Sequence, residues 1–148
     1  MESSELFLAR SRYYFQREYR TKLRAAVTAL PIDALWWRAN EQSNSVGNLL
    51  MHLTGNLREW VVGGVAGAPS LRDRNGEFAA RSGPGGEELL ASLEKTLDDV
   101  DDVLAKLGPA DLSSMRTIQG RAITVLEAVY HVVEHFSLHL GQIILIAK

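Results

Sequence analysis

Three histidines recur at four-residue spacing in the last part of the sequence: His131, His135 and His139. On a helix, four residues advance about 400°, so each ring is turned only about 40° from the previous one and lies one turn further along. Two imidazoles at this spacing can bind the same metal ion, as in helical H-x-x-x-H pairs. All three together span about 12 Å of helix axis, which is too far for one ion. A metal would therefore be bound by an adjacent pair.

A fourth histidine, His52, lies in a separate segment with a helical pattern. On that helical wheel, Asn48, Asn56 and Glu59 lie within about 40° of it. Trp60 belongs to the adjoining apolar arc and is expected in the core or in the wall of a pocket. His52 is therefore predicted at a boundary from which its side chain can reach into a groove. Two histidines from one helix and one from another form an open three-histidine site, the arrangement of catalytic zinc.

These histidines also have an ordinary structural explanation. A single histidine at the edge of an apolar face, such as His52, is more often a hydrogen-bonded residue of the core. An H-x-x-x-H pair often faces solvent, and His131 can be a hydrogen-bonding neighbour of the site or a polar residue of the helix surface. Spacing alone leaves the metal site and this alternative evenly balanced.

The elements that must position these residues follow from hydrophobic periodicity. Apolar residues recur at three- and four-residue steps in four segments, and strands are not clearly indicated. Pro31 ends the first helix, Ser43, Asn44 and Ser45 are candidate caps of the second, and Thr124 with Glu127 forms a capping box for the fourth. The predicted helices are residues 4–30, 46–65, 87–107 and 124–147. The sequence therefore predicts an all-α protein, a four-helix bundle that forms one domain over residues 1–148.

The segments between the predicted helices show no hydrophobic periodicity. Residues 70–86 are rich in glycine, arginine and proline and are predicted to be a functional or ordering loop, and residues 110–123 to be a short extended turn. Arg72, Arg74 and Arg81 in the longer loop are expected to be solvated or paired with the third helix more often than to bind an anionic substrate. The acidic face of the third helix is predicted to be solvated; its residues are Asp98, Asp99, Asp101 and Asp102.

The last helix carries an apolar arc opposite its histidines. Gln142 lies within the histidine stripe, while Glu134 lies about 60° away from it and either flanks the site or faces solvent. The arc is expected to pack against the remaining helices or against a second copy of the chain, and we predict a homodimer on this basis. Its residues are Val132, Val133, Phe136, Leu140, Ile143 and Ile144.

Composition excludes several classes of protein. The 148 residues include 16 basic and 18 acidic side chains, a formal net charge of −2, without the basic footprint of a nucleic-acid-binding protein. The absence of cysteine excludes disulfides, thiolate metal sites, iron–sulfur clusters and a cysteine nucleophile. The histidines and glutamates of the last helix argue against a membrane span. The first residues lack the pattern of a signal peptide, so the cytoplasm is the expected compartment.

Two segments carry a resemblance to a known family. Residues 44–57 (NSVGNLLMHLTGNL) and 131–143 (HVVEHFSLHLGQI) resemble the DinB/YfiT-like superfamily of metal-dependent enzymes. The resemblance covers nearly the whole chain, including Trp36, Trp37 and residues 74–78. It implies a four-helix bundle of this type.

The resemblance also implies a divalent metal ion, zinc or nickel, bound by His52, His135 and His139. His131 matches an additional histidine of one branch of the superfamily. The groups expected beside the metal or in the pocket are His131, Asn48, Asn56, Glu59, Trp60 and Gln142.

Characterised relatives include S-transferases and isomerases that use low-molecular-weight thiols such as mycothiol or bacillithiol. We therefore expect a metal-dependent transferase or hydrolase whose open position activates a thiol or water. The thiol would arrive as a co-substrate, so the chain needs no cysteine. The alternative is a non-catalytic metal-binding module or a dimeric helical interaction module.

Overall fold

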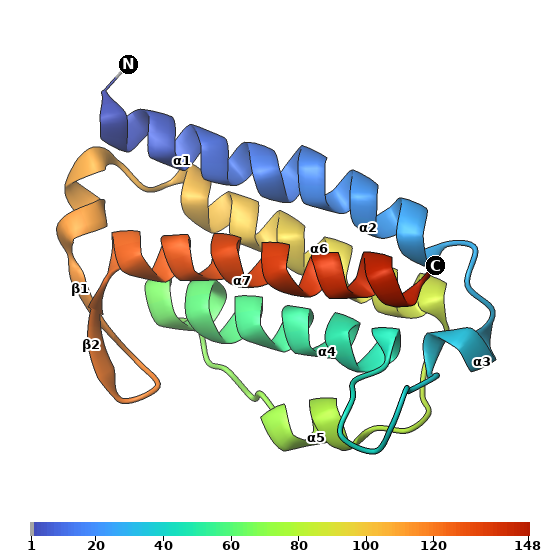
Figure 1. Cartoon of the computed structure of the whole chain (residues 1–148). Coiled ribbons are helices and arrows are strands. Elements are labelled where there is room, and N and C mark those ends of the chain that lie inside the picture. Colours follow the sequence, from blue (N-terminus) through green and yellow to red (C-terminus); the bar gives the residue numbers. More distant parts are fainter. Residues whose placement is uncertain (1) are drawn as a thin grey trace.

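The apolar stripes of the sequence form helical rods that lie side by side along their length (Figure 1). The computed structural model describes residues 2–148. The predicted four-helix bundle is confirmed within these residues, and the observed rods match the predicted helices to within a few residues. The rods are α1 (Ser3–Tyr13), η1 (Tyr14–Tyr19) and α2 (Arg20–Val27); α4 (Val46–Leu57) and η2 (Arg58–Val65); α6 (Gly86–Ala105); and α7 (Val125–Ile146). No helix of the described residues is long and apolar enough to cross a lipid bilayer.

Two of the rods contain a π-helical segment that periodicity did not predict. At the end of η2, the backbone N–H of Ala66 donates to the carbonyl oxygen of Val61 at 3.0 Å, one residue further back than in an α-helix. Such a segment widens the turn and is frequent at functional sites. It changes the direction of the side chains that follow α4, including Glu59 and Trp60.

Local hydrogen bonds fix where α4 and α7 begin. Of the three candidate caps for α4, the structure uses Ser45, whose hydroxyl accepts from the N–H of Asn48 at 3.0 Å. The predicted Thr124 capping box is confirmed, since its hydroxyl accepts from the N–H of Glu127 at 3.1 Å. These caps satisfy backbone donors that the first turn leaves free. They set the residue at which each histidine-bearing helix starts.

The connections contain short elements that the sequence pattern did not reveal. The loop predicted over residues 70–86 contains a helix, and the turn predicted over residues 110–123 contains a β-hairpin. Elements of four to six residues are too short to show a reliable period. These elements are α3 (Ile32–Leu35), α5 (Arg74–Ala79), η3 (Pro109–Ser113), β1 (Met115–Ile118) and β2 (Arg121–Thr124).

The hairpin lies against η2 near the start of α7 (Figure 1). Its strands are antiparallel, with Ile118 opposite Arg121, and its turn residues Gln119 and Gly120 have φ angles of 53° and 75°. Two left-handed residues match the twist of a tight hairpin. Strand β1 approaches η2 closely because Gly64 has no side chain; a Cβ there would overlap Ile118.

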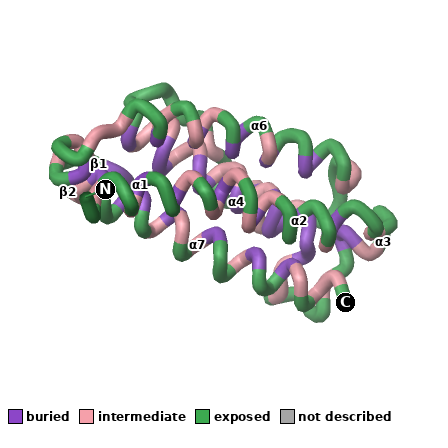
Figure 2. Tube along the Cα trace, turned by 90° about the horizontal axis from the view of Figure 1, so that it is seen from above, coloured by how far each residue is buried: buried purple, intermediate pink, exposed green. Residues whose placement is uncertain are grey.

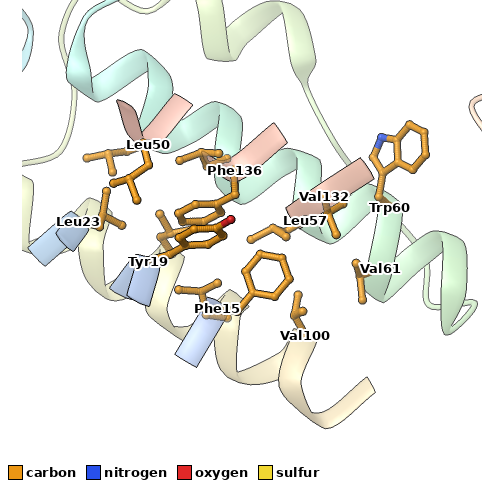
Figure 3. Packing of buried hydrophobic residues seen from close by; sticks show 14 of the residues in the cluster. Phe15, Tyr19, Leu23, Leu50, Leu57, Trp60, Val61, Val100, Val132 and Phe136 are labelled. Atoms are coloured by element: carbon orange, nitrogen blue, oxygen red, sulfur yellow. The ribbon is translucent and has the colours of Figure 1, made fainter. Parts of the chain in front are cut away.

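Most of the apolar arc of α7 is buried inside the chain, and its two half-buried residues, Val133 and Ile144, pack against the same core. The Phe136 ring stacks on Tyr19 with the centroids 4.9 Å apart, and Phe15 meets Phe136 edge-on at 5.9 Å (Figure 3). Figure 2 shows buried residues on the helix sides that face the middle of the bundle. The arc therefore packs against the remaining helices and does not require a second copy of the chain. The arc therefore no longer supports the predicted homodimer, which stays a prediction.

The acidic face of α6 is solvated at Asp98 and Asp102, as predicted, and three of its four aspartates also form ion pairs with other helices. Asp98 and Asp101 pair with arginines of the first rod, and Asp99 pairs with one that follows α4. The shortest N···O distances are Arg20–Asp98 2.7 Å, Arg12–Asp101 2.8 Å and Arg58–Asp99 3.1 Å. Such partly exposed pairs each contribute about 0.2–1 kcal/mol. They orient α6 without dominating the stability of the fold.

The contact of Phe136 with Tyr19 and Phe15 predicts a large effect of its truncation. Phe136→Ala should lower the free energy of unfolding by about 3–5 kcal/mol, because it removes a fully buried ring and leaves a cavity. Urea denaturation followed by circular dichroism measures this change. The control is Leu138→Ala on the same helix, whose residue is 56% exposed. Equal losses for the two variants would contradict the packing described here.

Candidate metal centre

The three predicted ligands meet between two helices. His52 comes from α4, His135 and His139 come from α7, and the two helices lie side by side (Figure 1). Nε2 of His135 is 2.9 Å from Nε2 of His52 and 3.2 Å from Nε2 of His139. One nitrogen from each residue lies within 4.8 Å of the other two, a cluster that could hold a metal ion.

Hydrogen bonds on the outer nitrogens fix the tautomers of two of these rings. Nδ1 of His52 is 3.1 Å from Oε1 of Glu77, and Nδ1 of His139 is 2.7 Å from Oε1 of Gln142. An ionised carboxylate and an amide oxygen only accept hydrogen bonds, so each Nδ1 carries the proton. Nε2 of His52 and of His139 therefore presents a lone pair to the cluster.

Arg72 also approaches the outer nitrogen of His52, at 3.1 Å from its Nη2. The same Nη2 donates one of its two protons to Oε1 of Glu77 at 2.9 Å, so this contact alone does not assign the tautomer of His52. A lone pair on Nδ1 of His52 would face the carboxylate oxygen and be repelled by it. The protonated Nδ1 is thus the form that fits this surrounding.

The donor set fits a divalent cation. Nitrogens bound tetrahedrally to one zinc ion at about 2.0–2.1 Å lie about 3.3 Å apart. The two Nε2 distances at His135 are slightly shorter than this, and the three ligand nitrogens all lie within 4.8 Å of one another, which is close to the spacing that a shared ion requires. A proton on Nε2 of His135 can serve only one of its two neighbours, and its Nδ1 has no hydrogen-bond partner within residues 2–148. Imidazole suits zinc, nickel, copper and iron, so the ligands do not specify the metal.

Three histidines of α7 are held in the neutral form that binds metals. Burial, together with the nearby rings of His139, His52 and His131, lowers the pKa of His135 from 6.5 to about 3. Burial also lowers the pKa of His139 and of His131. A charged imidazolium has lost its lone pair. Near neutral pH these three rings therefore keep the nitrogen that a cation needs.

Glu77 is the main residue of the site that sequence reasoning missed. It lies on α5 and is only 5% exposed. Burial opposes its ionisation, but hydrogen bonds from His52 and Arg72 outweigh this effect and hold its pKa below the usual value. The available signal was its place in residues 74–78, a segment that resembles the DinB/YfiT-like superfamily.

Arg72 connects Glu77 to a second carboxylate. Its Nε and Nη2 donate to the two oxygens of Glu77, both at 2.9 Å, and its Nη1 donates to Oε2 of Glu59 at 2.6 Å. The side chain of Arg72 is 5% exposed. The expectation that it is solvated or paired with α6 is therefore wrong. The pair is bidentate, which fixes the orientation of the Glu77 carboxylate.

Two residues of α4 allow Glu77 to reach His52. A Cβ at position 55 would collide with the Glu77 carboxylate, so Gly55 leaves the space that the carboxylate occupies. Nδ2 of Asn48 donates to the carbonyl oxygens of Glu77 and Ala80, both at 2.8 Å. Asn48, predicted beside the site, thus acts from behind α5 by tying it to α4.

The remaining predicted residues divide into two groups around a cavity of about 750 Å³ that the three histidines line. Asn56, Trp60 and His131 line this cavity, and the Trp60 and His131 rings lie against each other with their centroids 4.0 Å apart and their planes tilted by 32°. The second group lies outside the lining: Glu59 behind Arg72, Gln142 against His139, and Glu134 exposed beside a groove between α1 and α7.

Comparison with known proteins places the chain in a family. A family model described as a protein of unknown function (DUF1572) matches residues 2–148. The chain belongs to the DUF1572 family. None of the curated proteins matches it significantly.

The fold of this DUF1572 member is DinB-like. Its structure is similar to the crystal structure of a DinB-like protein from Bacillus cereus ATCC 10987, with a TM-score of 0.73. The two sequences are 14% identical, and the match covers 94% of this chain and 87% of that one. The resemblance stated from residues 44–57 and 131–143 is thereby confirmed for the fold.

The position of Glu77 predicts that its charge contributes to metal affinity. Glu77→Gln should weaken the affinity for zinc by about 10–100-fold, because a neutral amide polarises and orients the His52 ring less strongly. Competition with a chromogenic chelator measures this affinity. Glu134→Gln is the matched control, since it removes an exposed carboxylate that neighbours His135 in the sequence. An unchanged affinity in Glu77→Gln would show that Glu77 only stabilises the fold.

Proposed function

We propose that this protein is a metal-dependent enzyme, a transferase or hydrolase, in which His52, His135 and His139 bind a divalent cation, zinc or nickel. The convergence of three Nε2 atoms supports this proposal most strongly. Three ligands from the protein, with no acidic residue of the described chain in the same cluster, leave the open position that distinguishes catalytic from structural zinc sites. The cavity beside the cluster provides space for a substrate at that position.

A bound divalent cation supplies Lewis acidity, which lowers the pKa of a thiol or water that coordinates it. The chain has no cysteine, so a reacting thiol would be a low-molecular-weight co-substrate. The DinB-like fold supports this choice only by resemblance to thiol-dependent S-transferases. Water as the second reactant would make the protein a hydrolase.

The residues of the chain have separate roles in this proposal. Glu77 and Gln142 hold the outer nitrogens of His52 and His139, so that both Nε2 lone pairs point to the shared centre. The adjacent rings of Trp60 and His131 form one wall of the cavity and exclude water from that side. A bound substrate would thus contact an aromatic surface next to the position where it reacts.

Alanine substitutions test both the metal and the activity. His52→Ala, His135→Ala and His139→Ala should each reduce the metal content well below that of the wild type, because two imidazoles bind a cation far more weakly than three. Elemental analysis of gently purified protein measures this content. Glu134→Ala is the control and should retain the metal of the wild type.

Turnover separates an enzyme from a non-catalytic metal-binding module. We expect a panel of low-molecular-weight thiols with an electrophilic acceptor to show turnover that stops on chelation and returns with added metal. A protein that binds metal but shows no turnover with thiols or with hydrolysable esters would support the non-catalytic module. A wild-type protein that binds no divalent cation would contradict the proposal altogether.

A further inference from the structure

Two arginines face the histidine cluster from different elements. Arg74, on α5, and Arg121, on β2, both line the cavity of the cluster. The Arg74 guanidinium is 5.3 Å from the ring centre of Phe78, and the Phe78 ring is 4.7 Å from that of His52. Arg74 is therefore held beside the histidines by aromatic contacts.

The hairpin places Arg121 over the same cavity. Its turn is anchored to η2, since Nε2 of Gln119 donates to Oε2 of Glu59 at 3.0 Å. Glu59 in turn accepts from Arg72, which pairs with Glu77. The ion-pair network behind His52 thus also fixes the hairpin that carries Arg121.

The charges around the cavity do not balance. Arg72 is neutralised by two carboxylates, but the guanidinium groups of Arg74 and Arg121 form no ion pair within residues 2–148. No aspartate or glutamate of the described chain lines the cavity. A divalent cation on the histidines would add two more positive charges. The cavity is therefore locally positive in a chain whose formal net charge is −2.

A further buried group in the cavity lacks a partner. Asn56 is 4% exposed, and its Oδ1 accepts no hydrogen bond within residues 2–148. Leaving a buried polar atom unpaired costs about 1–3 kcal/mol. A ligand with an O–H or N–H group would satisfy this oxygen. The lining thus offers two guanidinium groups, an amide oxygen without a donor and a wall of aromatic rings.

We propose that the cavity binds a small organic molecule whose carboxylate or phosphate group lies between Arg74 and Arg121. A donor atom of the same molecule reaches the open position beside His52, His135 and His139, so this inference rests on the proposed function. Guanidinium groups bind carboxylates and phosphates through paired hydrogen bonds, which gives both affinity and orientation. The arginines select the ligand by its charge, while the histidine cluster acts on its reactive end.

Two thiols that differ in charge test this inference on the cobalt-loaded protein. We expect 3-mercaptopropionate to bind at least about tenfold more tightly than 2-mercaptoethanol. The thiolate-to-cobalt absorption band measures the binding of each thiol. The R74Q/R121Q variant should lose this preference and still bind cobalt and 2-mercaptoethanol. The R17Q/K106Q variant, with the same loss of charge at exposed positions outside the cavity, should keep it.

The outcomes separate the two proposals. Equal affinities of the wild type for the two thiols, or a preference that survives in R74Q/R121Q, would overturn the anion site. If no cobalt binds, the proposed function fails. The anion site is then tested separately on the metal-free protein. Inorganic phosphate and succinate should then each shift the ¹⁵N-labelled indole resonance of Trp60, assigned with Trp60→Phe, in the wild type but not in R74Q/R121Q. If neither anion produces a saturable shift of this resonance in the wild type, the inference is overturned.

Discussion

Imidazole lone pairs that converge in a partly buried space repel one another, and a cation relieves this repulsion best. One proton on His135 can link only two of the three rings, whereas a divalent ion can bind to all of them. The outer nitrogens of His52 and His139 lie against Oε1 of Glu77 and Oε1 of Gln142, which favours the tautomers whose Nε2 lone pairs face the cluster. The caps of α4 and α7 and the packing of Phe136 hold the rings at this distance.

The connections between the helices supply residues that the site needs in addition to the histidines of the bundle. The bundle supplies the histidines, but α5 and the hairpin supply the carboxylate behind His52 and two arginines of the cavity wall. This agrees with the general tendency of loops to carry function on a rigid scaffold. The network from Glu77 through Arg72 to Glu59 joins both connections to α4 and η2. Burying these charges is costly unless they are paired and hydrogen-bonded, as they are here.

The sequence predicted the bundle and an H-x-x-x-H pair for a clear physical reason, whereas the choice of the three metal ligands among the four histidines came from the family resemblance. Helical periodicity repeats over twenty residues or more, and H-x-x-x-H spacing places two rings on one face whatever the rest of the fold does. The apolar arc of α7 was ambiguous because a helical wheel gives a direction but no partner. Phe15 and Tyr19 supply that partner from the other end of the chain. Glu77 and Arg72 were missed because their contacts with α4 depend on tertiary packing, and charged residues are otherwise expected in solvent.

X-ray absorption spectroscopy of the zinc-loaded protein tests the shared centre most directly, because it reports the ligands of the ion itself. The account predicts three imidazole nitrogens at about 2.0–2.1 Å and at least one ligand from outside the chain. Fewer than three imidazoles, or a first coordination shell made of carboxylates, would show that His52, His135 and His139 do not act together and would contradict the account.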